Sequence, residues 1–128
     1  MSEPVWLLPE VVTAVQRMLL AEHGGLPGIR DAGLLDSALA RPRQRWADEP
    51  DVSAFELAAS YTYGLARNHP FADGNKRVAL TVAAVFLELN GYVLDADEAE
   101  TVVVIEALAA GDLDEVALAD WLRENSRA

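Results

Sequence analysis

One short stretch of the sequence gathers residue types that can move a proton and bind a phosphate. The string His-Pro-Phe-Ala-Asp-Gly-Asn-Lys-Arg runs from His69 to Arg77 and joins two segments with helical spacing. A histidine titrates near neutrality, so His69 can take a proton from an attacking hydroxyl. Asp73 offers a hard carboxylate oxygen of the kind that holds Mg²⁺ between phosphates. The stretch therefore combines a candidate base with a candidate metal ligand.

The second half of this stretch falls at the predicted N-terminus of a helix, where unpaired N–H groups and the helix dipole attract anions. Gly74 lets a phosphate approach the backbone, because it carries no Cβ. Lys76 and Arg77 are cations, which are unfavourable at this end of a helix unless an anion binds there. We therefore take Gly74, Asn75, Lys76 and Arg77 as candidate phosphate ligands. Arg67, at the end of the preceding helix, is either a further cation for the site or a residue that the helix dipole favours there.

Each of these residues also has a structural interpretation. Asp73 is of a residue type that commonly caps a helix N-terminus. His69 can be a structural or surface histidine, and residues 75–77 can be an ordinary solvated first turn. Phe71 is expected to anchor the loop on the core under either interpretation. From the residues alone, phosphate chemistry and a purely structural role both stay open.

Hydrophobic spacing predicts that helices position the stretch. We expect helices over residues 8–22, 33–40, 53–67, 74–89, 97–109 and 114–125. Ser53 and Glu56 form a capping-box pattern at the start of the third. The fourth is apolar on every face beyond Arg77, which is typical of a helix buried at the centre of a domain. Residues 41–51 hold two prolines and many charges, and predict an exposed loop. The expected fold is a single all-α domain over residues 1–128.

Composition limits the classes of partner. The formal net charge is −11, which argues against binding a nucleic-acid backbone. Residues 30–77 hold seven basic and seven acidic side chains, so the whole net charge lies outside this middle segment. This uneven distribution means either a solvated acidic surface or a middle segment that tolerates an anion. The chain has no cysteine, no signal-peptide pattern and no apolar run long enough to cross a membrane. We expect a cytoplasmic protein that binds neither nucleic acid nor membrane.

The stretch from His69 to Arg77 resembles the signature of the Fic family, His-Pro-Phe-x-Asp/Glu-Gly-Asn-Gly-Arg-x-x-Arg. Two positions depart from it: Lys76 stands where the second glycine is expected, and Leu80 where the final arginine is expected. Both departures are typical of the Doc (death-on-curing) branch, which continues Asn-Lys-Arg-x-Ala-Leu. Gly-Gly at 24–25, Gly-Ile-Arg-Asp at 28–31 and Asn-Gly at 90–91 also resemble Doc landmarks, so the resemblance covers nearly the whole chain.

This resemblance implies a toxin of a type II toxin–antitoxin system, acting as a protein kinase with ATP and Mg²⁺. The implied reaction transfers the γ-phosphate of ATP to a threonine of elongation factor Tu, which stops translation. His69 would be the general base, and Asp73 would hold Mg²⁺ or orient the nucleophile. Asn75, Lys76 and Arg77 would stabilise the transferred phosphoryl group.

The resemblance also implies two macromolecular contacts. A cognate antitoxin would fold its C-terminal helix into an apolar groove on the toxin. The predicted loop of residues 41–51 falls where the family places a flap that aligns the target. Arg43, Arg45 and Trp46 are therefore candidates for target docking, with a solvated loop as the equal alternative.

Two other functions are weighed against this one. The first is AMP transfer to a protein hydroxyl, as in Fic enzymes with the full signature, and Lys76 and Leu80 argue against it. The second is a non-catalytic remnant that only binds the antitoxin. The presence of His69, Asp73 and Asn75 together argues against such a decayed site.

Overall fold

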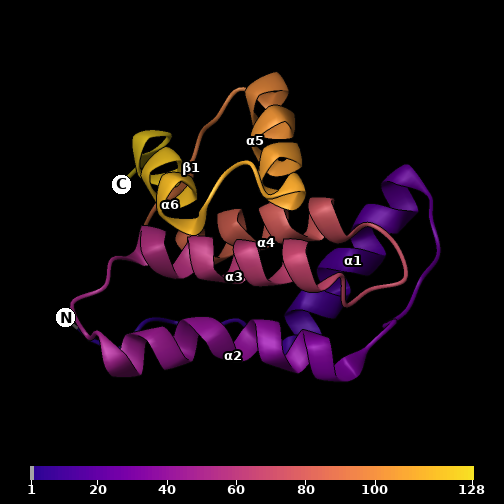
Figure 1. Ribbon diagram of the computed structural model, residues 1–128, viewed down its shortest axis with the longest axis horizontal. Coiled ribbons are helices and arrows are strands. Elements are labelled where there is room, and N and C mark those ends of the chain that lie inside the picture. The colour runs from indigo at the N-terminus through magenta and orange to yellow at the C-terminus, as the bar shows by residue number, and fades with distance from the viewer. Residues whose placement is uncertain (1) are drawn as a thin grey trace.

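Residues 2–128 of the computed structural model form a helical bundle with a very small sheet (Figure 1). The helices are α1 (Pro9–His23), α2 (Ala32–Asp48), α3 (Ala54–Asn68), α4 (Asn75–Leu89), α5 (Glu98–Ala110) and α6 (Glu115–Glu124). Strands β1 (Val93–Leu94) and β2 (Ser126–Arg127) pair antiparallel, with Val93 opposite Arg127. The all-α class is confirmed. Among the described residues, no helix has the length and hydropathy that crossing a bilayer requires.

The centre of the molecule is the pair α3 and α4, which the other helices cover. α2 lies along one side of α3, while α6 packs against its other side and α1 packs against α4 (Figure 1). The rings of Tyr61 and Phe86 meet with centroids 5.1 Å apart, and both side chains are fully buried. The Thr62 hydroxyl donates to the carbonyl of Ala79 at 2.8 Å, which fixes the two helices against each other. The central buried helix predicted after the motif is α4, and α3 contributes even more buried side chains.

The segment before α1 is anchored on this core. The Leu7 N–H donates to the Tyr61 hydroxyl at 3.2 Å. Burial raises the pKa of Tyr61 above its ordinary value of 10.0, so the phenol stays neutral in this site. Trp6 lies between Trp46 and Phe86, with 6.2 Å between ring centroids in each case. Trp6 is thus part of the core's edge.

Four helices begin with a side-chain cap. In each, the N-cap carboxylate or hydroxyl accepts a hydrogen bond from the backbone N–H three residues on; these caps are Asp31, Ser53, Asp97 and Asp114. The predicted cap at Ser53 is confirmed. α4 differs, because its N-cap is Gly74 in the left-handed conformation, with φ 76°, and no side chain caps it. The buried helix at the centre therefore has an open N-terminus.

The predicted loop at residues 41–51 is wrong over residues 41–48, because α2 continues through Pro42 to Asp48, and only residues 49–51 form an exposed turn. Proline has no N–H to donate to the carbonyl four residues back, and its ring crowds that carbonyl, so it normally ends a helix. Here Pro42 is itself buried, Trp46 packs on Trp6, and Arg45 is held by carboxylates of other helices. Tertiary contacts thus override the local preference of proline for ending a helix.

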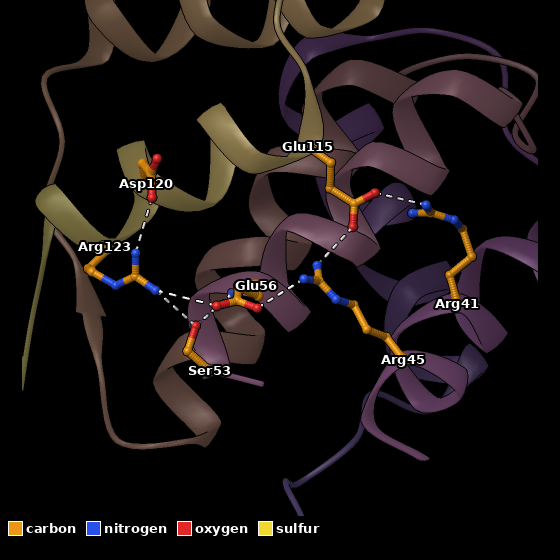
Figure 2. Close-up of polar contacts among 7 residues, drawn as sticks. All are labelled: Arg41, Arg45, Ser53, Glu56, Glu115, Asp120 and Arg123. Carbon is orange, nitrogen blue, oxygen red and sulfur yellow. Dashed lines mark hydrogen bonds and ion pairs between the residues drawn. The ribbon is translucent and has the colours of Figure 1, made fainter. Parts of the chain in front are cut away.

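An ion-pair network ties α2, α3 and α6 together (Figure 2). Glu115 of α6 accepts from Arg41 Nη2 at 2.8 Å and from Arg45 Nη1 at 3.3 Å. Arg45 Nη2 also donates to Glu56 Oε2 of α3 at 2.9 Å. Arg123 of α6 lies 3.7 Å from the other oxygen of Glu56. Because the network joins three helices at one point, it holds the C-terminal half of α2 in helical form.

Removing the Glu115 carboxylate tests this account. Glu115→Ala leaves two arginines without their shared partner, and we expect a loss of about 1–2 kcal/mol in the free energy of unfolding. The matched control is Asp95→Ala, which breaks the far more exposed pair with Arg127 and should change stability little; the exposed side-chain fractions are 19% for Glu115 and 77% for Asp95. Urea unfolding measures both. An equal loss in the two variants would contradict a role for the network.

Candidate functional site

A pocket of about 500 Å³ lies between the N-terminus of α4 and the side of α5. Six of the predicted site residues line it: His69, Asp73, Gly74, Asn75, Lys76 and Arg77. The opposite wall is made by Thr101, Val102, Ile105 and Glu106 of α5, to which the sequence analysis gave no role. Their spacing of three and four residues places them on one helix face, but nothing in the sequence shows which surface that face meets.

His69 is held in an unusual backbone conformation. It is the C-cap of α3, with φ 49° and ψ 56°, and its N–H donates to Leu65 O at 3.3 Å. Among residues 2–128 it is the only non-glycine residue with positive φ. The left-handed region costs such a residue about 1–2 kcal/mol. The candidate base therefore stays in place only because surrounding contacts fix the loop.

Asp73 is fixed by backbone N–H groups and does not cap α4 by a side-chain hydrogen bond. Its carboxylate accepts from Gly74 N–H at 2.9 Å and from Leu26 N–H at 3.3 Å, and its carbonyl accepts from Gln16 Nε2 at 3.3 Å. An ionised carboxylate has further lone pairs, which suits it to a cation.

The surroundings of Asp73 set how a metal would be bound. Within residues 2–128, no group of three or more His, Cys, Asp or Glu side chains gathers as a metal site. A metal at Asp73 would thus need phosphate oxygens and water as its other ligands. That is the usual mode of Mg²⁺, so the single carboxylate fits this ion.

The N-terminus of α4 is prepared for an anion. Its first bonded N–H is that of Val78, which donates to Gly74 O at 2.9 Å. The N–H groups of residues 75–77 have no acceptor within the described chain, and the first turn holds no acidic residue. The Arg77 guanidinium forms no ion pair or hydrogen bond within residues 2–128, and Arg77 is exposed. Three N–H groups and a cation therefore remain available to a phosphate.

Asn75 and Lys76 already have partners in the protein. Asn75 Oδ1 accepts from the Phe71 N–H at 2.9 Å, and its Nδ2 donates to the Phe71 carbonyl at 3.0 Å. Phe71 is 1% exposed, so this clasp ties the loop to an anchor in the core, as expected for Phe71. Lys76 Nζ lies 2.9 Å from Glu106 Oε2 across the pocket. Direct phosphate contact by either residue stays a prediction.

Four predicted residues lie away from the pocket. Arg67 is not among its lining residues; its guanidinium lies 5.8 Å from the centroid of the Tyr63 ring. Arg43 lies over the ring of Trp6 at 5.4 Å, on the surface of α2. Arg45 and Trp46 hold α2 in place, as described above. The structure thus replaces most of the loop expected at residues 41–51 by helix, whereas a role of Arg67 in the site and of Arg43, Arg45 and Trp46 in target docking stays a prediction.

A segment between α1 and α2, which no sequence pattern linked to the site, forms main-chain hydrogen bonds to the motif loop. Residues 24–31, between α1 and α2, run along the motif loop. Ala72 N–H donates to Gly28 O at 3.0 Å, and Arg30 N–H donates to Pro70 O at 2.7 Å. Ile29 and Phe71 form an isolated antiparallel bridge. The loop that carries His69 and Asp73 is therefore braced by main-chain hydrogen bonds along its length.

Comparison with known proteins identifies the family of the chain. The sequence model of the Fic/DOC family matches residues 6–87. The chain belongs to the Fic/Doc family. It is 37% identical over 116 residues to the protein kinase Doc of Escherichia phage P1, covering 90% of each chain. It is 40% identical over 99 residues to the toxin Doc of Mycolicibacterium smegmatis, covering 73% of this chain and 76% of that one. The resemblance to the Doc branch is confirmed.

The bracing of Asp73 in this Fic/Doc site is testable at two glycines. Gly25 has φ +125°, and a Cβ there would lie 2.8 Å from Asp73 Oδ2 and from Leu20 Cδ2. Gly28 has a similar φ of +107°, but a Cβ there would meet nothing within 4 Å. Both alanine variants carry backbone strain, whereas only Gly25→Ala also displaces the carboxylate. We expect the free energy of unfolding of Gly25→Ala to be lower than that of Gly28→Ala by about 1 kcal/mol or more.

Urea unfolding measures the difference in stability between the two variants. The amide resonance of Gly74, whose N–H donates to Asp73, should move more in Gly25→Ala. Equal stability and equal Gly74 shifts in the two variants would show that the close contact at Gly25 has no effect on Asp73.

Proposed function

We propose that this Fic/Doc protein is a toxin that transfers the γ-phosphate of ATP to a threonine hydroxyl of elongation factor Tu and so inhibits translation. The observation that carries the proposal is one pocket in which His69 and Asp73 lie at an uncapped helix N-terminus flanked by Lys76 and Arg77. A pocket of about 500 Å³ is of the size that small-molecule sites have. The relative from phage P1, named a protein kinase, supports phosphoryl transfer.

In this reaction the threonine oxygen bonds to the γ-phosphorus, and the bond from that phosphorus to the bridging oxygen breaks, so ADP leaves. The His69 imidazole takes the hydroxyl proton. The free N–H groups of residues 75–77, together with Lys76 and Arg77, stabilise charge on the transferred group. Asp73 would hold Mg²⁺, which when bound neutralises charge on the phosphates. Asn75 fixes the conformation of the loop through its two hydrogen bonds to the Phe71 backbone.

Leu80 supports γ-phosphate transfer over AMP transfer. It lines the pocket at the position where the full Fic signature has an arginine. An apolar side chain there removes one cation that would orient the inner phosphates of ATP. The cations that remain lie at the first turn of α4, where they can serve a terminal phosphate.

The proposal includes a cognate antitoxin whose C-terminal helix packs into an apolar groove, and a cytoplasmic site of action. Apolar side chains are exposed at and near α1, which is the kind of surface that an amphipathic helix covers. Leu8, Val11 and Met18 have exposed fractions of 54%, 37% and 55%.

The first test labels the product. The protein is incubated with elongation factor Tu, Mg²⁺ and ATP labelled at either the γ- or the α-phosphate. We expect label on a threonine from the γ position only, and none with His69→Ala or Asp73→Asn, because proton removal and metal binding are then lost. Label from the α position would mean AMP transfer. No label from either would exclude this target, and repeating the assay in a cell lysate would then search for another.

The pair between Lys76 and Glu106 gives a second test. Both side chains are exposed, with fractions of 44% and 57%, and the carboxylate repels any phosphate that approaches Lys76. Glu106→Gln should lower the KM for ATP about two- to fivefold at low salt, an effect that shrinks at high salt. The control is Glu98→Gln, which removes a charge from the same helix outside the pocket. An unchanged or higher KM in Glu106→Gln would show that the carboxylate does not oppose ATP.

A further inference from the structure

We propose that Arg30 is a positioning residue for His69, because its guanidinium fixes the backbone on both sides of the candidate base. The inference rests on the proposed function, in which His69 takes the hydroxyl proton. Arg30 does not line the pocket, so it can act there only through His69. No feature of the motif itself marks Arg30, which lies 39 residues before His69 in the chain.

The backbone of His69 needs this support. Its φ of 49° and ψ of 56° lie in the left-handed region, which residues other than glycine uncommonly adopt. The imidazole forms no hydrogen bond within residues 2–128, so no partner of the ring holds it. The backbone therefore sets the direction of the Cα–Cβ bond, and with it the positions that the imidazole can reach by rotation about χ1 and χ2.

One rigid group holds both peptide planes that meet at His69. Arg30 Nε donates to His69 O at 2.8 Å, and Arg30 Nη2 donates to Asn68 O at 3.0 Å. These carbonyls belong to the planes on either side of the His69 Cα, and each plane is stiff. Because the guanidinium is planar, its two N–H groups hold the two planes at a fixed angle. Fixing that angle fixes the φ and ψ of His69.

Neighbouring contacts keep Arg30 itself in place. The N–H groups of Arg30 and Asp31 both donate to Pro70 O, at 2.7 and 3.1 Å. The amide of Asn68 donates to Leu34 O at 3.0 Å, which ties the end of α3 to α2. The guanidinium thus reaches His69 from a backbone that is already bonded to the next residue of the loop.

A simpler role for Arg30 would be a charge at the C-terminus of α3, which the helix dipole favours. That role needs only a cation. Lysine keeps the cation and loses the planar pair of donors, so Arg30→Lys separates the two roles. Arg17→Ala is the matched control, because Arg17 is an exposed arginine of α1 without a hydrogen bond or ion pair within the described chain.

The first readout does not depend on activity. The chain has two histidines, His23 and His69, so His23→Gln leaves one imidazole signal by NMR. In that background we expect Arg30→Ala and Arg30→Lys to move the His69 ring resonances, and Arg17→Ala to leave them unchanged. Ring resonances that stay at their wild-type positions in the folded Arg30 variants would overturn the proposal. If Arg30→Ala does not fold, Arg30→Lys alone decides.

The second readout is the label transfer described above. Both Arg30 variants should lose about ten- to a hundredfold in kcat, the effect of a misplaced reacting group, with less than about a twofold change in the KM for ATP.

Ethylguanidinium, at a concentration that does not denature the protein, should restore part of the kcat of Arg30→Ala and none of that of His69→Ala. Wild-type kcat in Arg30→Lys would overturn the proposal, because charge alone would then suffice. A wild-type protein that transfers no label would refute the proposed function, and the NMR comparison would still decide on Arg30.

Discussion

The open N-terminus of α4 is the feature on which the rest of the structure depends. Three N–H groups at this end have no acceptor within the described chain, and two cations follow the glycine that begins the helix. Without an anion this arrangement is unfavourable, because unpaired N–H groups and cations lie together at the positive end of the helix dipole. The packing of α4 on α3, through Thr62 and the Tyr61–Phe86 contact, offsets that local cost. The proposed phosphate site thus lies at the N-terminus of a helix whose packing on α3 offsets the cost of an uncapped end.

The supporting residues act without lining the pocket. Gln16, only 1% exposed, holds the carbonyl of Asp73 from α1, and Gly25 leaves room for the Asp73 carboxylate. Arg30 holds the carbonyls around His69 from the segment between α1 and α2. These groups come from the first 31 residues, whereas the candidate reacting groups come from the middle of the chain. The N-terminal part of the molecule is therefore needed for the geometry of the site as well as for burial.

Sequence reasoning succeeded where the relevant signals are contiguous. The motif from His69 to Arg77 lies within nine residues, so its placement at a helix start followed from helical spacing and from Gly74. The cap at Ser53 was likewise a local pattern. The extent of α2 did not follow from local signals, because proline breaks helices in isolation. Burial of Pro42, the packing of Trp46 on Trp6 and ion pairs to α3 and α6 offset that tendency here. Nearness in sequence made Arg67 a candidate for the site, with a helix-terminal role as the alternative; its guanidinium lies 5.8 Å from the Tyr63 ring centroid, outside the pocket lining.

The charge of the whole molecule bears on how a phosphate reaches this pocket. A formal net charge of −11 repels ATP at long range, yet such repulsion is screened over about 8 Å at physiological ionic strength. Within that distance, an anion at the first turn of α4 meets the free N–H groups, Lys76 and Arg77 before it meets the acidic surface. Two carboxylates line the pocket: Asp73 lies beside this turn, where the proposed Mg²⁺ would offset its charge, and Glu106 lies on the opposite wall and is already paired with Lys76. Local attraction at the first turn of α4 can therefore exceed the repulsion from the net charge of the whole protein. Glu106 is the residue of α5 that can weaken this local attraction.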